Sequence, residues 1–97
     1  MKIILSEEAL LWFNDEMEVK QDDFIRFYPR YGGSSPFHVA FSLGMNREEP
    51  LDIGVETVHN GVHYYIEKDD EWFFNGHDLL VHVDTQLDEL KYDYTKH

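Results

Sequence analysis

Residues 60–83 read NGVHYYIEKDDEWFFNGHDLLVHV, and this stretch decides the fold. The pair Asn-Gly occurs twice in it, at Asn60-Gly61 and at Asn75-Gly76. Asn-Gly favours a two-residue type I′ turn, because both of its residues tolerate a positive φ. The stretch therefore predicts a β-hairpin around Asn60-Gly61, one or two helical turns over 68–74, and a returning strand over 79–83.

The turn at Asn60-Gly61 also fixes the register of the hairpin. His59 must pair with Val62, and Val58 with His63. Successive side chains of a strand point to opposite faces of a sheet, so His59 and His63 lie on opposite sides. These two histidines therefore cannot chelate one metal ion.

The rest of the chain predicts one helix and further short strands. Ser6 is a typical helix N-cap, and the apolar residues that follow it recur at helical spacing. Apolar and polar residues alternate in two later segments, the second of which places Phe37 and Val39 on its inward face. The remaining polar segments are expected to be a loop and a tail, in which Leu87, Leu90, Tyr92 and Tyr94 are candidate anchors and the last residues fray. The predicted ranges are strands at 2–5, 23–31 and 36–44, a helix at 7–18, a loop at 45–52 and the tail at 84–97.

These elements predict a single domain, residues 1–97, of the mainly β (α+β) class. Six or seven short strands would form a distorted β-barrel or a sandwich with one N-terminal helix. The seven Phe, six Tyr and two Trp supply enough apolar area for a compact core. Pro29 lacks an N–H donor, so its part of the strand at 23–31 should lie at an edge or near a bulge.

Composition excludes several classes of function. The 20 acidic residues outnumber 8 basic ones, and the net charge of −12 repels nucleic acids and anionic membrane surfaces. No apolar run reaches the ~18 residues of a membrane span. Glu7 and Glu8 come too early for a signal peptide, so we expect a cytoplasmic protein. The absence of cysteine rules out disulfides, thiolate nucleophiles and cysteine-ligated zinc or iron–sulfur sites.

The glycine-rich segment 32–35 and its neighbouring arginines form the first candidate site. Such a loop can present successive main-chain N–H groups to an anion, and two arginines on one strand face can bind a carboxylate or phosphate. The alternative is an ordinary turn whose arginines pair with the chain's own carboxylates. The residues of this candidate ligand or partner surface are Arg26, Arg30, Gly32, Gly33, Ser34, Ser35 and His38.

Other polar residues give weaker signals. His82 and Asp84 share a strand face, yet no histidine pair has metal-ligand spacing on the predicted helix, and scattered surface histidines explain the pattern equally. The acidic runs lie in loops of a strongly acidic chain and read as solvated charge. Phe24 and Tyr28 share a face with the two arginines, which indicates either a contact surface or a second small core. No nucleophile–base pair or carboxylate dyad stands out, so we expect no enzyme activity and no cofactor.

The order of these features resembles the HesB-like domain, the fold of the A-type iron–sulfur carriers. The likeness covers most of the chain and depends on order and spacing rather than on any one motif. The chain is similar to the short, cysteine-free branch of that family found in Gram-positive bacteria. The matching features are the helix opening Ser6-Glu7-Glu8-Ala9, the arginine strand ending in Gly32-Gly33-Ser34-Ser35, Phe41, the unit from Gly61-Val62 to Asn75-Gly76, and Leu79.

The resemblance also implies what this chain has lost. The family's first cysteine ligand maps onto Ser34, and its Cys-x-Cys pair falls near Tyr94 to His97 or beyond. A serine hydroxyl is a weak ligand for a soft iron–sulfur cluster. The resemblance therefore implies a non-enzymatic relative of the iron–sulfur assembly carriers that works as a binding or adaptor module for a protein partner. The alternative is a protein that binds a small anion, or a metal through His and carboxylate, in the region from Arg26 to His38.

Overall fold

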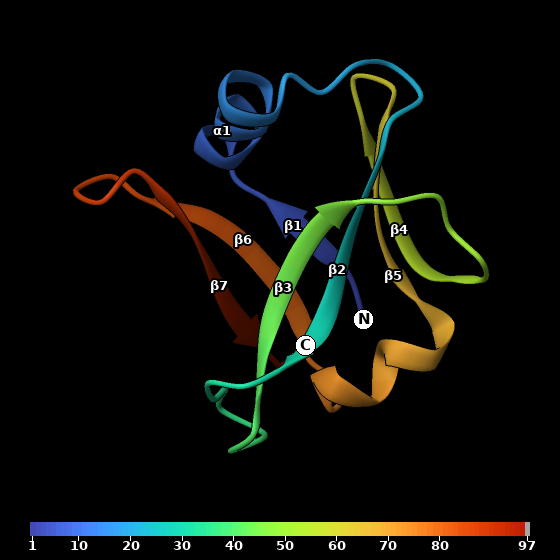
Figure 1. Ribbon diagram of the computed structural model, residues 1–97, viewed down its shortest axis with the longest axis vertical. Helices are drawn as coiled ribbons and strands as arrows, with labels where there is room; N and C mark the ends of the chain where they lie inside the picture. The colour runs from blue at the N-terminus through green and yellow to red at the C-terminus, as the bar shows by residue number, and fades with distance from the viewer. Residues whose placement is uncertain (97) are drawn as a thin grey trace.

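A computed structural model describes residues 1–96 (Figure 1). Seven strands form two sheets, and one α-helix and one 3-10 helix accompany them. His97, the last residue of the predicted tail, lies outside the described residues. The elements are β1 (Ile3–Leu5), α1 (Glu7–Met17), β2 (Phe24–Tyr31), β3 (Phe41–Arg47), β4 (Ile53–His59), β5 (Val62–Glu67), η1 (Lys68–Phe74), β6 (Asp78–Asp84) and β7 (Glu89–Thr95).

The two sheets combine parallel and antiparallel pairs. The smaller sheet has the order β1-β6-β7, and β1 runs parallel to β6. The larger has the order β3-β2-β5-β4, and β2 runs parallel to β5 over only three residue pairs. Within residues 1–96 the two sheets stay separate and form no closed barrel. The predicted mainly β class is confirmed, in its sandwich-like form.

The helix α1 forms where its N-cap predicts. The Ser6 hydroxyl oxygen accepts a hydrogen bond from the N–H of Ala9 at 3.1 Å. Glu18 ends the helix in the left-handed conformation, with φ of 49°. Ala9 and Phe13 form the buried face. No helix of the described residues is long and apolar enough to cross a membrane.

Aromatic rings tie the helix and both sheets into one core. Phe13 of α1 lies 5.1 Å from the ring of Tyr64 in β5 and 6.3 Å from that of Phe27 in β2. Phe27 meets Tyr92 of the smaller sheet at 6.0 Å, edge to face. The buried core cluster comprises Ile3, Leu5, Ala9, Phe13, Ile25, Phe27, Val62, Tyr64, Ile66, Phe73, Phe74, Leu79 and Val81.

The predicted hairpin register is confirmed. His59 pairs with Val62 and Val58 with His63, and both Asn60 and Gly61 have positive φ, as a type I′ turn requires. The predicted helical turn over 68–74 is the 3-10 helix η1, and the returning strand is β6.

Pro29 lies at a position of β2 where its missing N–H donor costs no hydrogen bond between strands. The strand β2 pairs with β5 only from Phe24 to Arg26. Within the described part of the chain, β3 is the only strand beside β2 at Pro29, so the other side of β2 is an edge there.

Two predicted boundaries and the predicted tail are wrong. The strand predicted at 36–44 is β3, which begins at Phe41 and continues to Arg47, through part of the predicted loop at 45–52. Pairing with β2 from Ile25 to Tyr31 sets this register, so residues 32–40 must turn the chain, and Val39 is 90% exposed. The predicted tail contains β7, which pairs with β6 along its whole length. Its alternate residues Leu90, Tyr92 and Tyr94 pack against the core, which confirms them as anchors, whereas Leu87 is 66% exposed in the turn before β7.

Candidate functional site

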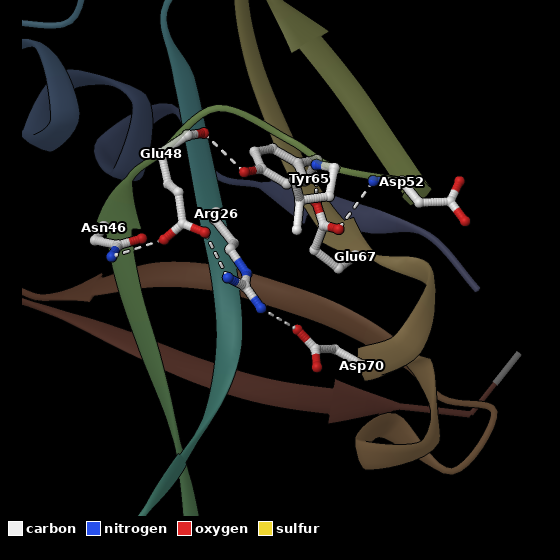
Figure 2. Close-up of polar contacts among 8 residues, drawn as sticks. Arg26, Asn46, Glu48, Asp52, Tyr65, Glu67 and Asp70 are labelled. Carbon is white, nitrogen blue, oxygen red and sulfur yellow. Dashed lines mark hydrogen bonds and ion pairs between the residues drawn. The ribbon is translucent and has the colours of Figure 1, made fainter.

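Arg26 is occupied by the chain's own carboxylates. Its guanidinium donates to Glu48 at 2.6 Å and to Asp70 at 2.7 Å, and so joins β2 to the β3–β4 connection and to η1 (Figure 2). Burial is the largest single influence on the pKa of Arg26 and lowers it, but the hydrogen bonds and charges of the two carboxylates together raise that pKa. For this arginine the structure matches the alternative of an internal ion pair.

A second polar contact fastens the same connection. Glu67 at the end of β5 is buried, and its two carboxylate oxygens accept from the N–H groups of Leu51 at 2.9 Å and Asp52 at 3.0 Å. The hydroxyl of Tyr65 donates to the Glu48 carbonyl at 2.7 Å (Figure 2). Burial, followed by the charges of Glu48 and Glu67, raises the pKa of Tyr65 to about 12. The Arg26 side of the larger sheet is therefore an internal network, although Nε of Arg26 is buried with no hydrogen-bond partner among residues 1–96.

Arg30 differs from Arg26. Its side chain is exposed at the end of β2 and has no hydrogen bond or ion pair within the described chain. The glycine-rich loop beside it offers fewer donors than its sequence predicts. The N–H of Gly32 donates to the Ala40 carbonyl at 2.7 Å, and that of Ser35 to the His38 carbonyl at 2.9 Å. Among residues 1–96, no group accepts a hydrogen bond from the N–H groups at positions 33 and 34. Two of the four N–H groups of the predicted anion nest therefore remain open.

Exposed aromatic and apolar side chains surround this loop. Tyr31 is 83% exposed, Val39 90% and Trp72, on η1, 52%. The rings of Tyr31 and Trp72 both contact that of Phe41, at 5.7 Å and 5.6 Å between centroids, so these three aromatic side chains form a continuous group. Arginine, tyrosine and tryptophan are the residue types that dominate the energy of protein interfaces. We call the surface formed by Tyr31, Val39 and Trp72 the loop face; Arg30 precedes Tyr31 in β2 and lies beside this surface at the same end of the strand.

Two polar atoms under the loop face are buried with no hydrogen-bond partner among the described residues. They are Nε2 of His38 and the hydroxyl oxygen of Ser42. The His38 ring lies 5.1 Å from that of Trp72 and 5.3 Å from that of Phe73, so aromatic side chains surround it. An unpaired buried polar group costs about 1–3 kcal/mol, which makes this loop a place where a polar ligand group or a loop movement is favourable.

The histidines of the strands contact neighbours on their own sheets, and His77, in the turn before β6, contacts the Asn75 carbonyl and the ring of Phe37. His63 lies 3.0 Å from Glu56, and His82 lies 2.6 Å from Asp93 rather than contacting Asp84. Within residues 1–96, no three side chains of His, Asp or Glu come together as metal ligands would. The histidine and carboxylate signals of the sequence thus resolve into separate pairs.

The predicted aromatic–arginine face on β2 is largely engaged by its neighbours. Phe24 stacks on His63 at 4.5 Å and meets the ring of Tyr65 edge to face at 6.1 Å. The Arg26 guanidinium lies 5.5 Å from the centre of the Tyr28 ring. These contacts form a small layer on the outer face of the larger sheet.

The sequence did contain a signal for Trp72. Three consecutive aromatics at 72–74 cannot all be buried on one side of a strand. In the 3-10 helix, Phe73 and Phe74 enter the core and Trp72 stays exposed. Nothing local in the sequence pointed to Tyr31 or Val39, whose exposure follows from the late start of β3.

Known proteins similar to this chain are small bacterial proteins. No family model matches the chain. A protein of Bacillus subtilis named pyruvate dehydrogenase inhibitor is 37% identical over 94 residues, which cover 97% of this chain and 99% of that protein. Uncharacterized proteins of Staphylococcus saprophyticus and Staphylococcus aureus are 34% and 32% identical over 95 residues, which cover 95% of this chain and 97% of each protein. The chain therefore belongs to the family that includes the B. subtilis pyruvate dehydrogenase inhibitor and these staphylococcal proteins.

Proposed function

We propose that this chain is a non-enzymatic protein that binds pyruvate dehydrogenase and inhibits it by direct contact. The observation that carries the proposal is the 37% identity to the B. subtilis pyruvate dehydrogenase inhibitor over 97% of this chain. Because the match covers 99% of that protein, no extra domain of the relative is needed to account for its named activity.

The physical character of the chain supports a protein partner. A net charge of −12 disfavours nucleic acids and anionic membranes, and the sequence offers no nucleophile–base pair for catalysis. Several large apolar side chains remain exposed, and Tyr31 and Trp72 of the loop face are joined through the ring of Phe41. Binding without catalysis is also what the prediction of a cysteine-free adaptor requires. The HesB-like ancestry itself stays a prediction.

We assign the contact to the loop face. Tyr31 and Trp72 are large, have few rotatable bonds, and lose little conformational entropy when a partner covers them. Arg30 is free to pair with a partner's carboxylate, and the open N–H groups of Gly33 and Ser34 lie on the adjacent loop. A polar group of the partner that reached Nε2 of His38 would also satisfy an atom that has no partner in the free chain.

The test is a titration of purified pyruvate dehydrogenase complex with this chain, followed by the rate of NADH formation. The wild-type chain should lower the rate in a saturable way. Trp72→Ala and Tyr31→Ala should each weaken inhibition by ~10-fold or more, the loss typical of an interface hot spot. Leu87→Ala is the matched control, since Leu87 is also a large exposed apolar residue but lies in the turn between β6 and β7.

Two outcomes would count against the proposal. A rate that is unchanged at a large excess of wild-type chain would remove pyruvate dehydrogenase as the partner. Equal inhibition by wild type and Trp72→Ala would move the contact away from the loop face.

The free Arg30 also favours a second candidate, the binding of a small anion beside the glycine-rich loop. Phosphate or a small carboxylate should then raise the melting temperature of the wild-type chain but not that of Arg30→Ala. An equal response from the two proteins would reject anion binding there.

A further inference from the structure

The outer side of α1 is bordered by two grooves that share one residue. The first, of about 510 Å³, runs between α1 and the β4–β5 turn, and its apolar wall includes Leu10, Val19 and Val62. The second, of about 270 Å³, lies between α1 and the β6–β7 turn, with Trp12 in its wall. Leu11 lines both grooves and is 61% exposed, so it forms an apolar ridge between them.

The second groove is held in shape by a direct contact. The indole N–H of Trp12 donates to the carbonyl of Asp88 at 3.2 Å, which fastens the β6–β7 turn to the helix. The groove is therefore a feature of the packed fold, and no movement of the turn is needed to form it.

Carboxylates lie at the rims of both grooves, and His59 and the amides of Asn14, Gln21 and Asn60 also line the first. Glu7 lines the first groove, and Glu8, Asp15, Glu16 and Asp88 line the second, whereas no lysine or arginine of the described chain lines either one. None of these five carboxylates forms an ion pair within residues 1–96. The apolar ridge thus has four unpaired carboxylates on the side of the second groove and one on the side of the first.

Helix stability accounts for only some of these charges. Glu7 and Glu8 lie in the first turn of α1, where carboxylates interact favourably with the helix dipole. Asp15 and Glu16 lie in the last turn, where the dipole disfavours them, and that turn has no basic residue of its own. The side chain of Arg47 does reach this end, but it contacts the Met17 carbonyl and Asp23. Local stability therefore gives no reason for Asp15 and Glu16.

We propose that this surface, the α1 face, is a docking site for an amphipathic protein segment that carries lysine or arginine. Apolar residues of the segment would enter the two grooves on either side of Leu11, and its cations would meet the rim carboxylates. An acidic or strongly anionic partner would be repelled by the same rim. Charge complementarity therefore selects the occupant.

The α1 face is separate from the loop face. Figure 1 shows α1 at one end of the molecule, and η1 with the β2–β3 connection at the other. The α1 face would bind a basic amphipathic segment whether or not pyruvate dehydrogenase contacts the loop face. One chain would then have two docking surfaces that can be occupied at the same time.

The test uses a synthetic helical peptide in which Lys and Leu recur at helical spacing, added to the isotopically labelled full chain. Amide NMR shifts should change at Leu10, Leu11 and Trp12 and around the two turns that close the grooves. Leu11→Ser, and separately Asp15→Lys with Glu16→Lys, should each weaken peptide binding by ~10-fold or more. The second variant keeps the test valid if the first one alters the fold.

Two controls separate docking from simple attraction between opposite charges. Leu51→Ser removes a residue that is 91% exposed and lines neither groove, and Glu49→Lys with Asp69→Lys makes the same charge change elsewhere. Both should bind the peptide nearly as well as wild type. A scrambled peptide of the same composition, which has no apolar face, should bind weakly.

The proposal is overturned if the peptide fails to bind, or if its shifts spread evenly over the acidic surface. It is also overturned if the control variants lose as much affinity as the α1 variants. Because the peptide assay contains no enzyme, its failure is distinct from a failure of the wild-type chain to inhibit pyruvate dehydrogenase.

Discussion

Replacing Glu67 with glutamine tests whether its buried contact with the main chain just before β4 stabilises the fold. In the native chain both carboxylate oxygens are acceptors, one for the N–H of Leu51 and one for that of Asp52. The amide of the Glu67→Gln variant would keep one oxygen and place an NH2 donor opposite the second N–H, which leaves two donors facing each other. Glu67 is only 7% exposed in the native chain, so water cannot readily replace the lost acceptor.

The size of the effect follows from the cost of unpaired buried groups. Each such group costs about 1–3 kcal/mol, and partial relaxation of the pair suggests a total loss of about 2–3 kcal/mol. For 97 residues the entropy of unfolding is about 0.2 kcal/mol per kelvin, so the melting temperature should fall by about 10–15 °C.

Urea unfolding followed by tryptophan fluorescence, together with calorimetry, measures both quantities. Glu49→Gln is the matched control, because Glu49 is exposed and has no hydrogen bond or ion pair in the described chain. Its stability should stay within about 0.5 kcal/mol of wild type. Equal losses for the two variants would refute the structural role assigned to the Glu67 carboxylate.

Two further predictions concern pH and turn geometry. Burial raises the pKa of Tyr64, Tyr65, Tyr92 and Tyr94 to about 12, against 10.0 when unperturbed. Between these two pKa values the folded chain keeps phenol protons that the unfolded chain loses, so stability is intact below pH 10 and falls between about pH 10 and 12. The phenolate absorbance of these tyrosines should therefore rise together with the loss of circular dichroism. Ionisation of all four tyrosines in a chain that keeps its native circular dichroism would contradict this prediction. Gly61→Ala should cost about 1–2 kcal/mol for its positive φ, plus the displacement of Gln21, whose Cγ would lie 2.6 Å from the new Cβ. Gly76→Ala is the control, because Gly76 has a similar φ but no atom lies within 4 Å of the Cβ that the substitution adds. If the urea midpoints of the two variants fall equally, Gln21 moves aside without cost.

Features with a local cause were predictable from the sequence. The turn at Asn60-Gly61 and the N-cap at Ser6 depend on a few adjacent residues, and both are confirmed. The start of β3 was not predictable in this way, because Phe37 and Val39 alternate as a strand would. The strand begins at Phe41 because of its pairing with β2, a contact between residues that are far apart in the sequence.

The strand β7 and the loop face illustrate the same limit. The apolar residues of β7 are spaced by charged and polar ones, so the segment looks like a solvated tail until β6 pairs with it. Three consecutive aromatics at 72–74 must either leave some ring exposed or cover a second layer, and only the 3-10 helix decides that Trp72 is the exposed one. Of the predicted site, Arg30 remains free while Arg26 is paired, and this difference depends on where Glu48 and Asp70 fall in space.

The parallel pairing of β1 with β6 has a consequence for biosynthesis. Lys2 donates its N–H to Asp78, 76 residues further along the chain, and Ile3 pairs with Leu79. At the usual ~5–20 residues per second, a ribosome needs roughly 4–15 s to make the segment that separates them. During that interval the apolar N-terminal strand has no partner, so a nascent chain of this protein should be a better substrate for chaperones than its small size suggests.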